Sequence, residues 1–255
     1  GYTRDVMARM ESVFGVSLPR EKGLDTMASM QAAERGEIDA ALIMGGNLYA
    51  SNPDSVWAEA ALERIGFKLF LTTTLNRGHV HGVDEGESLI LPVTARDEEW
   101  EPTTQESMFN YVRLSDGGVH RLDGVRPETM ILSDIAGRIA PDSGVDFAAF
   151  ARHSKLREAI ASIVPGMEEL ADIDVAKREF HIQNRLMHTP VFHTPSGKAA
   201  FTVRETPHHA ERNAELMLTT VRSEGQFNSI IYEEKDSYRG TATRWCVMMN
   251  AGDIA

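Results

Sequence analysis

The sequence contains a single cysteine, Cys246, in 255 residues. One thiol can form no internal disulfide, and it cannot supply a cysteine-rich zinc site or an iron–sulfur cluster. We therefore expect no iron–sulfur cluster and no zinc centre within this chain. Because Cys246 lies in the apolar run 244–249, which is typical of a strand, we expect it to be a buried structural thiol. One unpaired cysteine also fits a reducing, cytoplasmic setting.

The sequence also lacks long apolar runs and an excess of basic residues. No run approaches the roughly 20 apolar residues of a membrane-spanning helix, so we expect no membrane partner. Lys and Arg number 26 against 38 Asp and Glu, which gives a formal net charge of −12. Nucleic-acid surfaces need a basic patch that displaces counterions, so we expect no nucleic-acid partner. With 42% hydrophobic residues, the chain has the composition of a globular protein that buries a substantial core.

Apolar runs alternate with helical patterns in the first 95 residues. The patterns predict strands at 38–44, 67–73 and 88–93 and helices at 5–14, at 24–35 and through Trp57. Strand, helix and strand with short connections are typical of a parallel, doubly wound (Rossmann-like) α/β layer. Ligands in such sheets bind at the carboxyl ends of the strands. We therefore expect the loops 45–47 and 72–76 to lie side by side at one edge of the sheet.

The rest of the chain shows weaker periodicity. Residues 94–130 look irregular, residues 146–164 predict one helix or two broken ones, and residues 199–203, 216–221 and 244–249 predict strands. These patterns divide the chain into three regions. They are a Rossmann-like α/β region at 1–95, a mixed α+β connecting region at 96–213, and a strand-forming region at 214–255.

Hydrogen-bonding side chains cluster directly after the strand predicted at 216–221. They are Arg222, Ser223, Gln226 and Asn228. A plain hairpin needs only turn residues at such a point. A guanidinium can grip a phosphate at two points, and the two amides can pair with the edges of a planar heterocycle. The cluster therefore favours a planar, phosphate-bearing ligand, and a capped surface loop is the alternative.

Two glycines, Gly45 and Gly46, follow the strand predicted at 38–44. Glycines at a strand end let backbone N–H groups approach a phosphate, although a simple turn has the same composition. His79 and His81 alternate in the next loop without a neighbouring Cys or carboxylate partner. We expect both histidines to be solvent-exposed rather than metal ligands.

Several segments resemble, in order, the molybdopterin oxidoreductases, and most closely the formate-dehydrogenase-like alpha subunits. These segments are GEIDAALIMGGNLYASNPD (36–54), TTTLNRGHVHG (72–82), LILP (89–92), HTPSGKAAF (193–201), TVRSEGQFNSIIY (220–232) and YRG (238–240). The resemblance implies an enzyme that binds molybdopterin guanine dinucleotide with molybdenum. Such an enzyme removes two electrons from a small substrate, and formate oxidation is the type reaction. It also implies that residues 214–255 begin a cofactor-binding β-barrel domain.

The resemblance also implies which residues contact the cofactor. The guanosine and phosphate parts would be held by Gly45, Gly46, Asn47, Thr72, Leu75 and Asn76. Arg222, Ser223, Gln226 and Asn228 would contact the pterin or a phosphate. Ser107 would be a further cofactor contact, in a stretch that departs from the family's E-N-S-M-S. Lys198 is either a phosphate contact or an exposed hairpin lysine.

The resemblance covers only a C-terminal middle portion of the family's polypeptide. The iron–sulfur region and the segment with the metal ligand and substrate-handling residues have no counterpart here, and the chain begins with Gly1 rather than Met. We therefore expect a fragment, a partial reading frame or one piece of a split enzyme, without oxidoreductase activity by itself. Its partners would be a small-molecule substrate and the rest of the enzyme or an electron-transfer protein. The alternative is a non-catalytic nucleotide-binding or interaction module.

Overall fold

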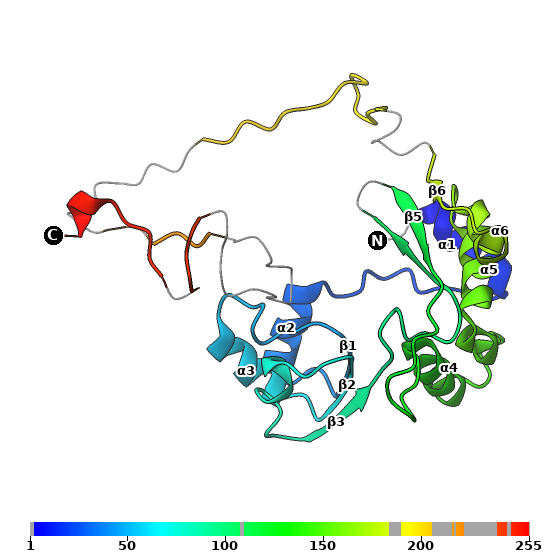
Figure 1. Ribbon diagram of the computed structural model, residues 1–255, viewed down its shortest axis with the longest axis horizontal. Helices are drawn as coiled ribbons and strands as arrows, with labels where there is room; N and C mark the ends of the chain where they lie inside the picture. Colours follow the sequence, from blue (N-terminus) through cyan, green and yellow to red (C-terminus); the bar gives the residue numbers. More distant parts are fainter. Residues whose placement is uncertain are drawn as a thin grey trace. The chain divides into compact units, whose positions relative to one another are not determined.

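The computed structural model describes residues 3–107, 110–183, 190–205, 216, 218–221, 239–243 and 246–254. The helices are α1 (Arg4–Phe14), α2 (Thr26–Glu34), α3 (Ser55–Glu63), α4 (Glu128–Ile139), α5 (His153–Ile163) and α6 (Ile173–Ala176) (Figure 1). The strands are β1 (Ala40–Met44), β2 (Phe67–Thr72), β3 (Glu87–Pro92), β4 (Thr103–Glu106), β5 (Tyr111–Ser115) and β6 (Phe180–His181). Short 3₁₀ turns are η1 (Arg77–His79), η2 (Phe147–Ala151), η3 (Glu168–Asp172) and η4 (Ala251–Asp253).

The chain divides into two compact units, and the boundary between them crosses the last residues of β2 and β3. The sheet unit comprises residues 24–70 and 75–90 together with the described residues after 203. The hairpin unit comprises residues 3–23 and 71–74 and the described residues of 91–202. The described residues thus form a mixed α/β structure, which agrees with the predicted α/β class. The predicted division of the chain into three regions stays a prediction.

Strands β1, β2 and β3 form a parallel sheet in that order. Glu87 N donates to Gly66 O (2.8 Å) and Val93 N donates to Thr72 O (3.1 Å), and this constant spacing sets the parallel register of β2 and β3. Helices α2 and α3 pack against each other. The core at this contact consists of Met30 and Ala33 of α2, Ala58, Ala61 and Leu62 of α3, and Ile65 just after α3. The parallel α/β layer predicted from the strand–helix–strand pattern is confirmed.

The prediction for the first helix of this layer needs a correction. The helix was predicted at 24–35, but the apolar side chains of Leu24 and Met27 are 58% and 52% exposed. The Asp25 side chain accepts a hydrogen bond from Ala28 N, so α2 starts at Thr26. The buried face is therefore formed by Met30, Ala32 and Ala33.

A fully buried lysine forms hydrogen bonds to the two segments that precede β2 and β3. Lys68 lies on β2, and its Nζ donates to Ile65 O (2.8 Å) and to Glu85 O (2.9 Å). Burial lowers the pKa of the Lys68 ammonium. Its two carbonyl partners replace the water that an exposed ammonium would bind, so the start of β2 and the loop before β3 are held together.

The hairpin unit contains structure where the sequence predicted an irregular region. Strands β4 and β5 pair antiparallel with Thr103 opposite Ser115, and β6 adds to β5. The prediction missed β4 because its residues, Thr-Thr-Gln-Glu, lack the apolar alternation that marks a half-buried strand. Helix α1 confirms the helix predicted at 5–14, and the break between η2 and α5 confirms the broken helix predicted at 146–164.

The strands predicted at 199–203, 216–221 and 244–249 are wrong for the residues described there. Those residues contain no strand, and Phe201 and Leu218 are exposed. Cys246 is also exposed, which contradicts the prediction of a buried thiol. An apolar segment becomes a strand only where a neighbouring backbone pairs with it, and composition does not determine that pairing. The described residues form no closed barrel.

Among the described residues, no helix combines the length and the apolar character that a membrane crossing requires.

Candidate functional site

Two glycines turn the chain at the carboxyl end of β1. Gly45 and Gly46 have φ values of 60° and 77°, in the left-handed region that favours glycine. A side chain built on either residue would meet nothing within 4 Å, so the space beside this turn is open. The backbone N–H groups of Gly46 and Asn47 have no hydrogen-bond partner among the described residues. The turn therefore offers donors that an anionic or carbonyl group can accept from.

Asn76 joins this turn to the loop after β2. Its Nδ2 donates to Gly46 O over 3.1 Å, and its Oδ1 accepts from Gly78 N over 2.8 Å. Its backbone N donates to His79 Nδ1 over 2.9 Å, which closes a capping box around η1. The predicted proximity of the loops at 45–47 and 72–76 is therefore confirmed.

Gly78 permits a close approach between the two loops. A Cβ at this position would lie 2.5 Å from Asn47 Oδ1 and 3.1 Å from Asn76 Oδ1. Asn47 cannot easily move away, because its Oδ1 accepts from Ala50 N (2.9 Å) and its carbonyl accepts from Ser51 N (2.9 Å). Only a residue without a side chain fits between the two asparagines.

A small recess lies where these loops meet the core of the sheet unit. Its lining consists of Ile43, Gly46, Asn47, Leu48, Tyr49, Leu62, Phe70, Gly78 and His79. The cavity volume is about 10 Å³, which is room for about one water molecule. The recess therefore does not hold a ligand group by itself, and its walls are mainly apolar and aromatic.

His79 forms one wall of the recess and contradicts the prediction of a solvent-exposed side chain. It is only 5% exposed, and its ring meets the edge of Phe70 with centroids 5.2 Å apart. Burial lowers the pKa of the His79 imidazole. The spacing Asn-x-x-His is the sequence signal that could have revealed it, because Asn and a residue three positions later can cap each other.

His81 has partners of a different kind. Its ring stacks on Tyr49 with centroids 4.2 Å apart, and its Nδ1 lies 2.9 Å from Glu59 Oε1 on α3. It is about one-third exposed, so the expectation of a freely exposed histidine holds only in part. In the described part of the chain, no group of three or more His, Cys, Asp or Glu residues could hold a metal ion.

The remaining predicted site residues have local roles. Thr72 ends β2 and its hydroxyl donates to Thr74 O (2.7 Å), while Leu75 is exposed. Ser107 closes the turn between β4 and β5, because its N donates to Tyr111 O (2.8 Å). Lys198 is exposed in a turn in which its carbonyl accepts from the Thr194 hydroxyl (2.7 Å).

Arg222, Ser223, Gln226 and Asn228, the cluster singled out from the sequence, lie outside the described residues. Their assignment to a cofactor stays a prediction.

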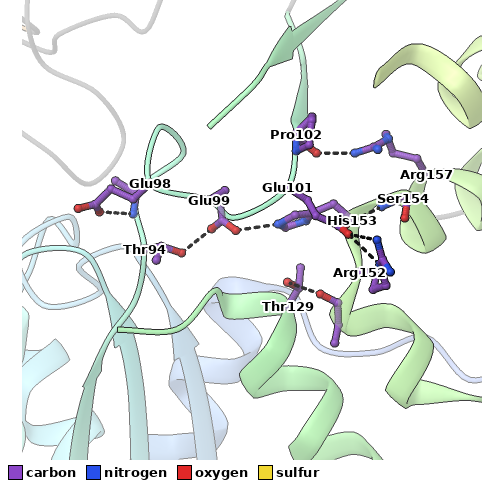
Figure 2. Close-up of polar contacts among 12 residues, drawn as sticks. Thr94, Glu98, Glu99, Glu101, Pro102, Thr129, Arg152, His153, Ser154 and Arg157 are labelled. Atoms are coloured by element: carbon purple, nitrogen blue, oxygen red, sulfur yellow. Dashed lines mark hydrogen bonds and ion pairs between the residues drawn. The ribbon is translucent and has the colours of Figure 1, made fainter. Parts of the chain in front are cut away.

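The hairpin unit holds a polar network that the sequence did not reveal (Figure 2). Glu99 and Glu101 are buried carboxylates in the loop between β3 and β4. Glu99 accepts from the Thr94 hydroxyl (2.7 Å) and lies 2.7 Å from His153 Nε2. Glu101 pairs with Arg152 over 2.6 Å. Both carboxylates thus meet the start of α5.

The network also caps α5. The N-cap residue of this helix makes no side-chain capping bond, and Ser154 N donates to Glu101 Oε2 instead (3.4 Å). The buried Arg157 donates to Pro102 O and pairs with Asp174 over 2.5 Å. Nearby, burial and then the charge of Glu99 raise the pKa of Glu128. The network anchors the loop 94–102 to the helices of its own unit.

Comparison with known proteins identifies relatives that are longer than this chain. No protein-family model matches the chain. It is 32% identical over 97% of its length to an uncharacterized oxidoreductase of Mycobacterium tuberculosis and, equally, to one of Mycobacterium bovis. It is 31% identical, again over 97% of its length, to the protein YdeP of Escherichia coli. The chain spans about a third of the length of these relatives, 33% for the mycobacterial proteins and 34% for YdeP.

Proposed function

We propose that this chain is the part of a molybdopterin-dependent, formate-dehydrogenase-like oxidoreductase that binds the guanine dinucleotide cofactor. The observation that carries the proposal is the bond from Asn76 to Gly46. It joins, at the carboxyl ends of β1 and β2, the two loops whose motifs resemble that family. Ligands of parallel α/β sheets bind at this edge. The names of the mycobacterial relatives, which match nearly the whole chain, support a redox enzyme.

The residues present fit part of such a cofactor. The N–H groups of Gly46 and Asn47 can bind a phosphate oxygen, because the space beside the glycine turn is open. None of the nine lining residues is Lys, Arg, Asp or Glu, so the lining does not balance the charge of a diphosphate. We assign that role to cations predicted elsewhere, Lys198 and Arg222.

The chain's contribution to the reaction is binding and orientation. When bound, the molybdenum cofactor supplies the two-electron chemistry. The turn 45–47 and the Asn76 loop would fix the nucleotide end, which sets the position of the pterin at the other end. Substrate and electron-transfer sites belong to the rest of the enzyme in this proposal. The separate chain, loaded with cofactor, should therefore show no formate-dependent dye reduction.

The test uses the full-length Mycobacterium tuberculosis relative, with changes at the positions that align with this chain. We expect the purified relative to contain molybdenum and to release two guanine nucleotides per molybdenum on acid hydrolysis, because the resemblance implies a bis-dinucleotide metal centre. Arg222→Ala should lower both contents, because a phosphate contact worth roughly 1.5–3 kcal/mol corresponds to about a ten- to hundredfold change in affinity. Arg222→Lys should recover only part of the loss, since an ammonium cannot reproduce the two-point grip.

Asn76→Ala should also lower both contents, and Lys155→Ala serves as the control because its pair with Glu158 is half exposed. A well-folded relative that contains neither molybdenum nor guanine nucleotide would contradict the proposal. That result would favour the non-catalytic module instead.

A further inference from the structure

Strand β1 lies at one edge of the parallel sheet, and the backbone groups on its outer side have no partner among the described residues (Figure 1). Phe67 N of β2 donates to Asp39 O (3.0 Å), so the carbonyl just before β1 points toward β2. Backbone groups of successive strand residues point alternately to opposite sides. The N–H and C=O groups of Ala40, Leu42 and Met44 therefore point away from β2, along the free edge.

No feature of β1 blocks pairing at this edge. Its sequence, AALIM, contains no charged residue and no proline. The Leu42 and Met44 side chains are 46% and 53% exposed. Proteins usually protect a solvent-exposed edge strand with charged side chains, proline or a bulge. An apolar edge without such protection is typical of a strand that pairs with another backbone.

The opposite edge of the same sheet is protected. Glu87 N donates toward β2, so the backbone of Pro92, which alternates with it along β3, faces the outer side. Proline has no N–H to offer a neighbouring strand. Just beyond β3, Thr94 N donates to Arg126 O (3.3 Å) on the same outer side. The β3 edge is therefore blocked at its carboxyl end, whereas the β1 edge is open along its length.

The helix layer indicates where a further strand belongs. Helix α3 connects β1 to β2, while α2 precedes β1 and shares a core with α3, so both helices cover the same face. Crossovers between parallel strands are almost always right-handed. A crossover through α2 would therefore run across the sheet in the same direction as the one through α3, and its first strand would lie outside β1. The described residues before α2 form α1 and a connection, 16–25, without a strand.

We propose that the free edge of β1 binds one extended strand from the polypeptide that the longer relatives carry outside the aligned third. The mycobacterial relatives match 97% of this chain, and the chain spans 33% of their length, so they contain such polypeptide. The added strand makes main-chain hydrogen bonds to Ala40, Leu42 and Met44 and covers part of the exposed Leu42 and Met44 side chains. The identity of the cofactor does not enter this inference.

Hydrogen exchange read at single amides tests the proposal without any substitution. In the 255-residue chain, the outward amides of Ala40, Leu42 and Met44 should be unprotected, while those of Ala41 and Ile43 face β2 and should be protected. In the full-length Mycobacterium tuberculosis relative, the three aligned outward amides should have protection factors at least about a hundredfold higher than in the chain. Unprotected outward amides in the relative would overturn the proposal.

Sedimentation of the same sample identifies the alternative occupant. Protected outward amides in a chain that sediments as a dimer would show that a second copy occupies the β1 edge. Protected outward amides in a monomer would show that the edge is closed within the chain. Either result would overturn the proposal.

Proline substitutions compare the two edges directly. Leu42→Pro removes an outward N–H from β1, and Ile90→Pro is the matched control because its N–H points outward on the protected β3 edge. At the aligned positions of the full-length relative, Leu42→Pro should lower the protection of the neighbouring outward amides by about three- to tenfold, because a hydrogen bond to the added strand is lost. Ile90→Pro should leave them unchanged.

The Leu42→Pro chain of 255 residues provides the folding check. It should keep the parent's protection at Ala41 and Ile43, since no bond to β2 is removed. Equal protection of the outward amides in the folded Leu42→Pro and Ile90→Pro relatives would refute the inference. If the substituted relative does not fold, the comparison between the parent chain and the parent relative decides. None of these outcomes depends on molybdenum or guanine content, so a failure here leaves the proposed function standing.

Discussion

The glycine turn of the sheet unit and the polar network of the hairpin unit differ in what their polar groups contact. In the network, Glu99 and Glu101 each face a cationic or imidazole partner within 2.7 Å. In the sheet unit, the backbone N–H groups of Gly46 and Asn47 have no partner in the described part of the chain, and Gly46 is exposed. An exposed N–H can bind water or a ligand, whereas a buried charged pair that loses one member leaves the other uncompensated.

The largest effect should follow from breaking the network at Glu99. Glu99→Ala removes the partner of His153 and Thr94. Because the His153 side chain is nearly buried, we expect a loss of about 3 kcal/mol in the free energy of unfolding. Urea denaturation measures it. Glu158→Ala breaks a half-exposed pair with Lys155 and should cost less than about 1 kcal/mol.

Guanosine binding by the Glu99→Ala variant provides a second test of this prediction. If the network only anchors its own unit, folded Glu99→Ala protein binds guanosine as the parent does. A loss of affinity, or a stability loss no larger than that of Glu158→Ala, would remove the distinction between the two regions.

The next effect should follow from filling the gap at Gly78. Gly78→Ala places a Cβ 2.5 Å from Asn47 Oδ1, and relieving this clash should cost about 1–3 kcal/mol and weaken guanosine binding. Thermal unfolding and nucleoside titration measure the two losses. Gly137→Ala is the control: its Cβ meets nothing within 4 Å inside α4, so it should stabilise by about 0.5–1 kcal/mol. Adding Asn47→Ala to Gly78→Ala should restore part of the stability, and no recovery would show that the clash is not the cause.

A smaller effect should appear in acid because of His79. Burial lowers the pKa of His79 in the folded chain, whereas an unfolded histidine titrates near 6.5. Below that pH the unfolded chain binds more protons, so stability should fall by up to about 1.4 kcal/mol per pH unit until His79 itself is protonated. The free energies of unfolding of the parent and of His79→Gln should be compared between pH 7.5 and pH 5. Parallel curves would show that His79 does not contribute.

The smallest effect should come from Glu128 in the hairpin unit. Its ionisation should make stability fall as the pH rises, which is opposite to the dependence expected from His79. Burial and the charge of Glu99 raise the pKa of Glu128, so the folded chain holds its proton at a pH where the unfolded chain has lost it. Stability therefore falls as the pH rises through this window, and Glu128→Gln should raise the melting temperature slightly at pH 7. The gain should vanish below about pH 4, where both states are protonated. A destabilised variant at pH 7 would show that the carboxylate makes a favourable contact.

Local periodicity made the sheet unit predictable. The runs that became β1, β2 and β3 are apolar and short, and the carboxyl ends of parallel neighbours meet at one edge, so the contact between Asn76 and Gly46 could be expected. Burial of His79 was missed because its partner, Asn76, was interpreted as a ligand contact rather than as a cap.

The hairpin unit was less predictable because its bonds join distant parts of the chain. Glu101 and Arg152 are 51 residues apart, and Glu99 and His153 are 54 apart, so no local pattern marks either pair. Strand β4 is polar and is stabilised by its pairing with β5. The apolar run 199–203, in contrast, forms no strand. Periodicity reports which side chains can be buried, and it does not report which backbones meet.

Chemical labelling of the buried Lys68 amine can measure local opening of the sheet unit. Its Nζ is enclosed and donates to two carbonyls, one before β2 and one before β3. Amine-reactive reagents can modify it only in molecules that have separated these two connections. Mass spectrometry of the peptide that contains Lys68 gives the rate of this labelling. That rate therefore measures how often the parallel layer opens locally.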